Sequence, residues 1–427
     1  MKRAATMMLA LALASASARA QRDSTWRDHE RALQGARQAN DTATYRAQLN
    51  AVYGAVGATP RIATRYAALA LGAGDTAGAS RWMGALAAMG AELDTGMVSR
   101  YAALAGAKAA SALRATQASA IRERGAPVLV ARLGDADMIS EDLAYDANGG
   151  RFLVSSVHRG GIYAVAAGRT TTLVEPRADS TWGMFALGVD SERGVLWATT
   201  AALPIGAGYS PADSGRSALM KFDLRTGAPR GRYVAPDSGA HVLGDLVVGS
   251  AGAVYVSDGL GGGVYALAPG NDSLRVLLPR GTFLSPQTPA LSSDGATLFV
   301  PDYSIGIAAV DVATGRITWL THSDSLALTG IDGMYRVGRD LIVVQNGLEP
   351  NRIMRLGLDP SMRRVVRATT IARGAVAASS LTHATVSRGW LYFLARSGWE
   401  RAADDGTLTA AASAADAPVI VRVRLAP

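Results

Sequence analysis

A strand-forming unit recurs through the C-terminal two-thirds of the chain and constrains its fold more than any other feature. Six short runs open the copies of this unit: EDLAYD at 141, FALGVD at 185, GDLVVG at 244, QTPALS at 287, DGMYRV at 332 and THATVS at 382. A second apolar run follows in each copy, such as TLFV at 297–300 after the turn pair Asp294-Gly295. The spacing of 43 to 59 residues between successive copies is typical of four-stranded propeller blades.

The two ends of the repeat region predict how the ring of blades closes. The run PVLVARL at 127–133 precedes the first copy without partners, and VIVRVRL at 419–425 supplies only a third strand to the last copy. If both runs share one blade, neither leaves an open edge strand. We therefore predict a mainly β protein with a six-bladed β-propeller at 124–427, closed by an N-terminal strand in the last blade.

The segment 21–123 has a different, helical pattern. It is rich in Ala, Arg and Gln, and apolar residues such as Tyr45, Leu49 and Val52 recur at helical spacing. We expect a small all-α domain of helical hairpins, similar to tetratricopeptide repeats over two or three hairpins. Two interpretations remain open: a helical cap packed on the propeller, or a groove that binds a protein partner.

The first twenty residues have the layout of a cleaved secretory signal. A basic start at Lys2 and Arg3 precedes the apolar run 7–14 and the small-residue ending Ala18-Arg19-Ala20. We expect a signal peptide at 1–20 and export to the periplasm or beyond. The apolar run is too short to span a bilayer, and no later run reaches eighteen uninterrupted apolar residues, so no membrane span is expected.

Charge and cysteine content exclude several classes of protein. Removing the signal with Lys2, Arg3 and Arg19 lowers the formal charge from +8 to +5. The remaining basic residues are almost all Arg placed singly, which does not form a nucleic-acid-binding face. The chain has no Cys, so disulfides and thiolate chemistry are excluded.

Four stretches carry a resemblance to a known family: 140–156, 243–258, 283–302 and 330–344. They resemble the six-bladed propellers of the senescence marker protein, gluconolactonase and luciferin-regenerating-enzyme superfamily, with strictosidine-synthase-like proteins as neighbours. The resemblance implies a divalent metal in the central channel, held by a Glu, two Asn and an Asp that open blades. Glu141 and Asp332 match the two acids, whereas Gly244 and Gln287 replace the two Asn.

The metal ligands implied by this resemblance are Glu141, Gln287 and Asp332, with Asp245 one place after Gly244. Such an oxygen set suits Ca²⁺, and less readily Mn²⁺ or Zn²⁺. Independently of the family, residues that open the innermost strands converge at one end of a propeller channel. Two carboxylates that face each other there repel unless a cation or proton lies between them. The alternative for Asp332, which precedes Gly333, is an ordinary turn residue.

The loops after the second strands should open on the same face as these ligands. We predict a polar and aromatic rim there, suited to a small oxygen-rich ligand. With Asp245, its candidates are His158, Asp258, Asp302, Tyr303, Asn346 and Trp399. Each has a structural alternative, because Asp258-Gly259 and Asn346-Gly347 are turn pairs and Trp399 can cover a blade edge.

Two functions compete at this point. One is a metal-dependent hydrolase of a lactone or ester, with Asp332 or His158 as the general base. The other is a non-catalytic propeller that binds a ligand, glycan or protein. Metal-free chemistry like that of the strictosidine-synthase-like neighbours is a third possibility. The chain lacks a serine nucleophile motif, a P-loop and a dinucleotide fingerprint in the right context.

Overall fold

The computed structural model describes residues 25–425 except 178–180, 375–379, 404 and 412. Within these residues, six helices are followed by twenty-four strands, in agreement with a mainly β fold and an N-terminal helical region. The signal peptide expected at 1–20 lies outside the described residues. No helix in the described part of the chain has both the length and the apolar character needed to cross a membrane.

The helices are α2 (Thr25–Gln38), α3 (Thr42–Val56), α4 (Pro60–Gly72), α5 (Thr76–Met89), α6 (Thr95–Ala105) and α7 (Ala107–Ile121). Four of them begin at a residue whose side chain accepts a hydrogen bond from the backbone of the first turn: Asp41, Thr59, Asp75 and Asp94. Such caps satisfy backbone N–H groups that have no partner within a helix. Local sequence therefore sets where these helices start.

The strands form six separate four-stranded sheets, and each sheet is one blade. Blades one to three comprise β2 (Leu143–Asp146), β3 (Arg151–Ser155), β4 (Ile162–Ala166), β5 (Arg169–Val174); β6 (Gly183–Asp190), β7 (Val195–Ala201), β8 (Ser217–Asp223), β9 (Pro229–Tyr233); and β10 (Leu243–Val248), β11 (Val254–Asp258), β12 (Val264–Leu267), β13 (Arg275–Leu278). Blades four and five comprise β14 (Ala290–Leu291), β15 (Thr297–Asp302), β16 (Gly306–Asp311), β17 (Ile317–Trp319); and β18 (Ile331–Val337), β19 (Asp340–Gln345), β20 (Arg352–Leu358), β21 (Val365–Arg373).

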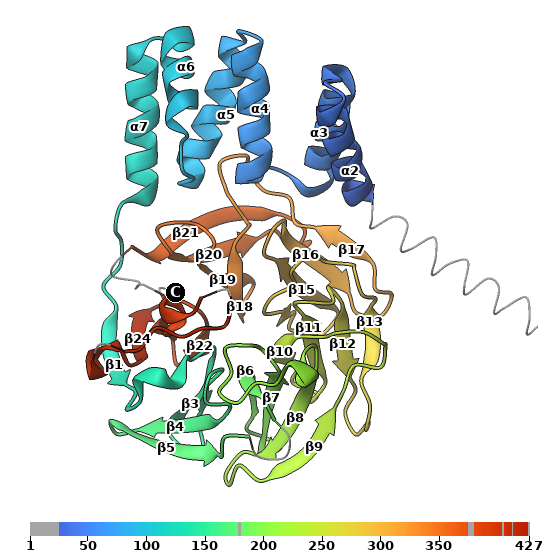
Figure 1. Cartoon of the computed structure of the whole chain (residues 1–427), viewed down its shortest axis with the longest axis vertical. Helices are drawn as coiled ribbons and strands as arrows, with labels where there is room; N and C mark the ends of the chain where they lie inside the picture. Colours follow the sequence, from blue (N-terminus) through green and yellow to red (C-terminus); the bar gives the residue numbers. More distant parts are fainter. Residues whose placement is uncertain (1–24, 178–180, 375–379, 404, 412, 426–427) are drawn as a thin grey trace, which may run out of the picture.

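The sixth blade joins the two ends of the propeller. It contains β22 (Ala384–Ser387), β23 (Trp390–Arg396), β24 (Val419–Arg424) and β1 (Val128–Arg132). Strand β1 pairs antiparallel with β24, from Val128 opposite Arg422 to Arg132 opposite Val419. The predicted closure is confirmed, and the six blades form a ring around a central channel (Figure 1).

Apolar side chains fill the spaces between neighbouring blades. Leu153 of the first blade, for example, is buried in one cluster with Leu196 and Met220 of the second. Similar clusters join the fourth blade to the fifth and the fifth to the sixth. Burial of these faces holds each blade against the next, so the innermost strands keep fixed positions around the channel.

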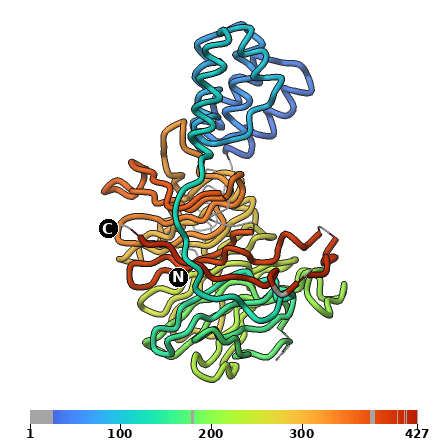
Figure 2. The backbone as a smooth tube through the Cα atoms, turned by 90° about the vertical axis from the view of Figure 1, so that its left-hand side faces the viewer, coloured from blue at the N-terminus to red at the C-terminus, as the bar shows by residue number. Residues whose placement is uncertain are grey.

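The helices stand beside the ring of blades and not over the channel (Figures 1 and 2). Tyr53 of α3 donates a hydrogen bond to Asp324 of the β17–β18 loop (2.8 Å), and Arg352 donates one to the carbonyl of Met89 (2.8 Å). Ala327 of the same loop is buried in the apolar cluster of the helices. Of the two interpretations of this segment, packing on the propeller describes the structure; whether the helices also bind a partner stays a prediction.

Candidate functional site

A cavity of about 470 Å³ lies where the innermost strands begin, at one end of the channel. Its lining includes Glu141, Gln287 and Asp332, which open the first, fourth and fifth copies of the repeat, and Thr382, which opens the sixth. The remaining lining residues come from loops: Ser285, Tyr303, Asn346, Glu349, Asn351, Ser380, Leu381, Trp399 and Glu400. We call this the upper cavity.

Two carboxylates and one imidazole meet at the floor of the upper cavity. Glu141, Asp332 and His383 each offer one ligand atom, and these atoms lie within 4.8 Å of one another. The indole N–H of Trp399 donates to Oε2 of Glu141, and the amide of Asn346 donates to Oδ2 of Asp332 at 2.7 Å. Each carboxylate therefore has one oxygen fixed by the protein and a second that can take a ligand.

The electrostatics of this pair favour a bound proton or cation. Burial raises the pKa of Glu141 to about 8, aided by the charges of Asp332 and Asp245 and opposed by that of His383. Burial also raises the pKa of Asp332 to about 6, with His383 again opposing. Above about pH 8 both protons are lost, which places two negative charges in one small space that a cation would offset.

His383 is engaged at both ring nitrogens and is 1% exposed. Its Nδ1 lies 3.0 Å from the backbone carbonyl of Glu141, and its Nε2 lies 2.8 Å from Oδ1 of Asp245. Thr288 completes the contact by donating to the same oxygen of Asp245 at 2.7 Å. Nε2 also lies 2.8 Å from Oγ1 of Thr288. A carbonyl and a carboxylate only accept hydrogen bonds, so these contacts favour a proton on each nitrogen, which makes the ring an imidazolium.

Electrostatics agree with a charged imidazole. Burial acts against the charge, but the carboxylates of Asp332, Asp245 and Asp142 together raise the pKa of His383 well above its ordinary value. In this state His383 is a counter-ion for the surrounding carboxylates and cannot ligate a metal, because a metal needs the lone pair of a neutral ring.

His383 was missed by sequence reasoning, although a signal existed. The second residue of the repeat's opening run is polar in four of the six copies: Asp142, Asp245, Thr288 and His383. All four are buried, and together they form a polar layer across the channel below the upper cavity. Side chains at successive strand positions point in different directions, so first-place residues line the cavity while second-place residues form this layer.

Several predicted residues do line the upper cavity. Gln287 lies in its wall, where its amide N–H donates to Oγ of Ser285 at 2.8 Å. Tyr303, Asn346 and Trp399 also line it, and the Tyr303 hydroxyl donates to Oδ1 of Asn346 at 3.0 Å. The structure thus brings together Glu141, Gln287 and Asp332 with three of the rim candidates.

The other rim candidates require correction. Asp245 is buried in the polar layer and is not at a rim. Asp258 is fully buried, accepts backbone hydrogen bonds from Val242 and Gly261, and contacts His241 at 2.7 Å. Asp302 is also fully buried and accepts from the backbone of Leu284 and Ser304. Both carboxylates close loops of their own blades, which leaves them unavailable to a ligand in the cavity.

His158 is also placed away from the upper cavity. Its Nδ1 bonds to the carbonyl of Ile205 at 2.6 Å, and it borders a separate crevice of about 20 Å³ with Arg177 and Trp182. Ile205 belongs to the β7–β8 loop, so the imidazole is bonded to a loop of the second blade. The alternative expectation, in which His158 and not Asp332 is the general base, is corrected, because His158 does not line the upper cavity.

The fold and the site together define a six-bladed β-propeller with an acidic cavity at one end of its channel. No protein-family model matches the chain, and no curated protein matches it. Solved structures of similar fold include the PQQ-bound aldose sugar dehydrogenase of Streptomyces coelicolor, at 15% identity over 71% of this chain and 99% of that chain, with a TM-score of 0.48. A gluconolactonase of Xanthomonas campestris matches at 16% identity over 71% and 96%, with a TM-score of 0.46. At such identities these similarities concern the fold and not the chemistry of the cavity.

Proposed function

We propose that the upper cavity binds a divalent cation between Glu141 and Asp332 and hydrolyses a small lactone or ester. The observation that carries this proposal is the convergence of the two carboxylates, with ligand atoms within 4.8 Å of each other, inside a cavity of about 470 Å³. Asp332 is 8% exposed, and the side chain of Glu141 is 16% exposed. Carboxylates rarely share so dry a site without a cation or proton.

The residues present fit a cation with oxygen ligands. Besides the two carboxylates and the amide of Gln287, the cavity wall includes two residues with buried oxygens that lack a hydrogen-bond partner: Oγ1 of Thr382 and Oδ1 of Asn351. With His383 protonated, the set is entirely oxygen and favours Ca²⁺. A neutral His383 would add a nitrogen ligand and shift the metal preference toward Mn²⁺ or Zn²⁺.

When bound, such a cation polarises a carbonyl and lowers the pKa of a bound water. The chain itself supplies the other parts. Asp332, in the wall of the upper cavity, is the group placed to accept a proton from water. Trp399 holds the Glu141 carboxylate in position, and Tyr303 adds a second aromatic surface to the cavity for the substrate ring.

The charge of the lining limits the substrate. Glu141, Asp332, Glu349 and Glu400 line the upper cavity, and its described lining contains no Lys or Arg. A neutral lactone or ester can enter, whereas a phosphorylated or carboxylated one is repelled. Hydrolysis creates a carboxylate in the product, so the same charges favour its release.

The test combines cation binding with turnover. The melting temperature is measured after chelation and after adding Ca²⁺, Mn²⁺ or Zn²⁺ singly, and lactone and ester hydrolysis is followed by acid release. An ion at about a hundredfold over its Kd stabilises by roughly 2.7 kcal/mol. Asp332→Asn should abolish the shift and the turnover. Glu349→Gln, which removes a charge at the same cavity, is the matched control and should keep both.

A binding role without catalysis is the second candidate. It is favoured by Gly244, which has no side chain where the resemblance implies an Asn ligand, and by Asp245, which is already bonded to His383. In that case the cation or ligand binds and melting temperature rises, but no ester or lactone is hydrolysed. Absence of turnover would overturn the proposed hydrolase, and absence of a thermal shift as well would overturn cation binding.

A further inference from the structure

One loop of the upper cavity also contacts the helices. The β19–β20 loop, residues 346–351, contributes Asn346, Glu349 and Asn351 to the cavity lining. Leu348, in the middle of this loop, packs instead against the apolar cluster of the helices. Neighbouring residues of one short loop therefore face the cavity and the helices.

A buried arginine bonds the end of this loop to a helix. Arg352, the first residue of β20, is 6% exposed, and its Nη1 donates to the carbonyl of Met89 at 2.8 Å. Met89 is the last residue of α5, and the free carbonyls at a helix C-terminus favour a positive charge. Burial lowers the pKa of Arg352 to about 10, aided by the charge of Arg373, so this guanidinium depends on such acceptors. The helices therefore help to fix the start of β20.

The same arginine joins the two ends of the loop. Its Nε donates to Oε1 of Gln345, the last residue of β19, which lies opposite Arg352 in the strand pairing. Gln345 is fully buried and donates in turn to the carbonyls of Ala327, at 3.0 Å, and Thr329 in the β17–β18 loop. Ala327 belongs to the apolar cluster of the helices. Both ends of the loop are thus connected to the helices, one directly and the other through the β17–β18 loop.

On its cavity side, the loop supports a ligand of the proposed cation. The amide of Asn346 donates to Oδ2 of Asp332 at 2.7 Å and accepts from the Tyr303 hydroxyl at 3.0 Å. Gly347, the next residue, passes so close to Gly330 that an added Cβ would lie 2.5 Å from the Cα of Gly330. Because hydrogen bonds weaken steeply away from their preferred length and angle, a small shift of this loop would remove the support of Asp332.

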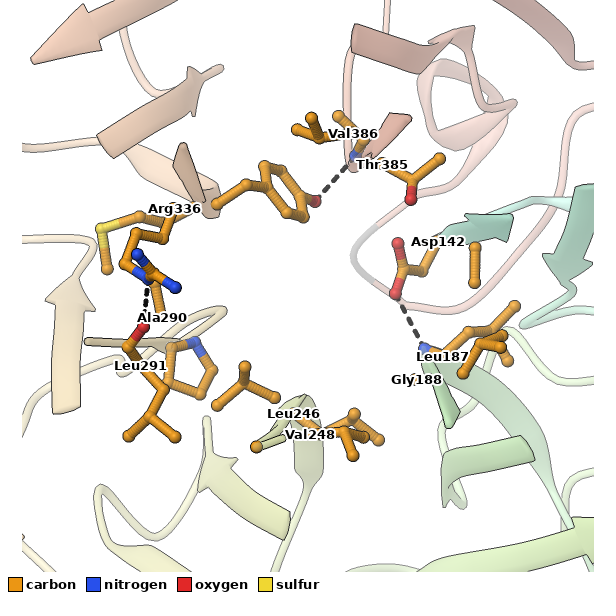
Figure 3. A pocket seen from close by; sticks show the side chains of 18 of the residues that line it. Asp142, Leu187, Gly188, Leu246, Val248, Ala290, Leu291, Arg336, Thr385 and Val386 are labelled. Atoms are coloured by element: carbon orange, nitrogen blue, oxygen red, sulfur yellow. Dashed lines mark hydrogen bonds between the residues drawn. The ribbon is translucent and has the colours of Figure 1, made fainter. Parts of the chain in front are cut away.

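The strand that carries Asp332 is anchored separately, within the propeller. Asp332 belongs to β18, whose far end reaches a second channel cavity of about 450 Å³ (Figure 3). There Nε of Arg336 donates to the carbonyl of Leu291 at 2.7 Å, which bonds β18 to the fourth blade (Figure 3). The helices therefore reach the cation site through the β19–β20 loop.

We propose that the helices form part of the cation site, because they hold the β19–β20 loop where Asn346 supports Asp332. Leu348 and Arg352 are positioning residues for that site. The proposal rests on the proposed function in one respect, since it takes Asp332 as a ligand of the cation. By linkage, a bound cation must strengthen the contact between loop and helices by the same factor by which that contact raises cation affinity. A partner that moves the helices would change the affinity of the cavity.

The test is a double-mutant cycle on the full mature protein. Calorimetry measures the Kd of the tightest-binding ion among Ca²⁺, Mn²⁺ and Zn²⁺. Asn346→Ala should weaken binding about tenfold, as loss of a hydrogen bond that supports a metal ligand generally does. Leu348→Ala should weaken it about three- to tenfold, and Leu348→Met, which keeps an apolar contact, should restore it. In the Asn346→Ala background, Leu348→Ala should have no further effect, because both changes act through the same bond.

Hydrogen exchange supplies a readout that needs no cation. Leu348→Ala should speed exchange of the loop amides, and a cation bound to the unaltered protein should slow exchange there and at the end of α5. Arg352→Met, which removes the bond to α5, should act in the same direction; the partly buried Leu348 carries the test if that variant does not fold. Leu104→Ala is the matched control, because Leu104 of α6 packs against the same helical cluster but lies outside the loop. It should leave the Kd and the loop exchange unchanged.

The outcomes separate this proposal from the proposed function. If no ion binds to the unaltered protein, the proposed function fails, and exchange of the loop alone decides whether the helices anchor it. If an ion binds and Leu348→Ala keeps its full affinity, the cation site stands and the role of the helices is overturned. Additive losses in the double variant would also overturn that role, as would loop exchange that Leu348→Ala does not change.

Discussion

Nε2 of His383, in the sixth blade, lies 2.8 Å from Oδ1 of Asp245, in the third. This contact crosses the channel between blades on opposite sides of the ring. Four carboxylates surround the ring electrostatically: those of Glu141, Asp142, Asp245 and Asp332. The imidazolium therefore offsets part of the negative charge at the floor of the upper cavity.

Replacing His383 by Gln should strongly destabilise the protein. The change leaves Asp245 buried without its cationic partner, and breaking a buried ion pair from one side costs about 3–5 kcal/mol. Urea unfolding measures the loss. His29→Gln is the control, because His29 bonds to Gln48 within the helices, outside the channel, and its replacement should cost less than about 1 kcal/mol. Similar losses in the two variants would contradict the role of the imidazolium.

Without added cation, the protein should lose stability as pH rises from about 5 to about 8. The folded-state pKa of Glu141 is raised to about 8 and that of Asp332 to about 6, so the folded protein holds protons that the unfolded chain releases. The raised pKa of His383 acts in the same direction. Urea unfolding across this range, with chelator present, measures the slope.

Glu141→Gln should flatten this slope and make the cation-free protein more stable at high pH, by roughly 1–3 kcal/mol. A bound cation should reverse the slope in the unaltered protein, because it competes with protons for the same oxygens. Stability that stays constant with pH in both proteins would show that the carboxylates do not titrate as argued.

Trp399→Phe should weaken cation binding while leaving the fold intact. The indole N–H bonds to Glu141 and lowers the pKa of that carboxyl, so its removal increases the competition from protons. We expect a Kd about three- to tenfold higher near neutral pH, by calorimetry. Trp390→Phe is the matched control, since Trp390 of the same blade packs against Arg422 and Arg424 instead. An unchanged Kd in Trp399→Phe would rule out this contribution.

Asp324→Ala should loosen the helices from the propeller. Its carboxylate accepts from Tyr53 at 2.8 Å and from Arg81 at 2.7 Å, which joins two helices to the β17–β18 loop. Because the ion pair with Arg81 is partly exposed, we expect the free energy of unfolding to fall by only about 1–2 kcal/mol. Hydrogen exchange should show faster opening of α3 and α5. Asp272→Ala, at an exposed residue of the propeller, should change neither the free energy of unfolding nor the hydrogen exchange of these helices.

Ile420→Asp should prevent the propeller from closing. Ile420 of β24 is fully buried among Leu133, Met138 and Leu394, so a charge there is left without a partner. We expect the free energy of unfolding to fall by more than about 4 kcal/mol. The freed strand edges should also cause aggregation, which size-exclusion chromatography detects. Val128→Asp changes β1 of the same blade at a residue that is 51% exposed, and it should remain monodisperse.

The amino-acid sequence alone determined the blade count, the strand runs and the closure by residues 127–133 and 419–425. These features are local, because alternating apolar residues and turn pairs specify each strand and its hairpin. The convergence of Glu141 and Asp332 also followed from sequence, since residues that open innermost strands lie around one end of the channel. The place of Gln287 in the same wall has the same origin.

Only the tertiary structure decided which polar residues face a cavity and which form hydrogen bonds that hold loops of the propeller. Asp258 and Asp302 look like rim residues in sequence, yet backbone N–H groups of neighbouring loops bind their carboxylates. The contact of His383 with Asp245 joins residues 138 positions apart and exists only when the ring is closed. Local patterns specify each strand, but contacts across the channel depend on the summed geometry of six blades.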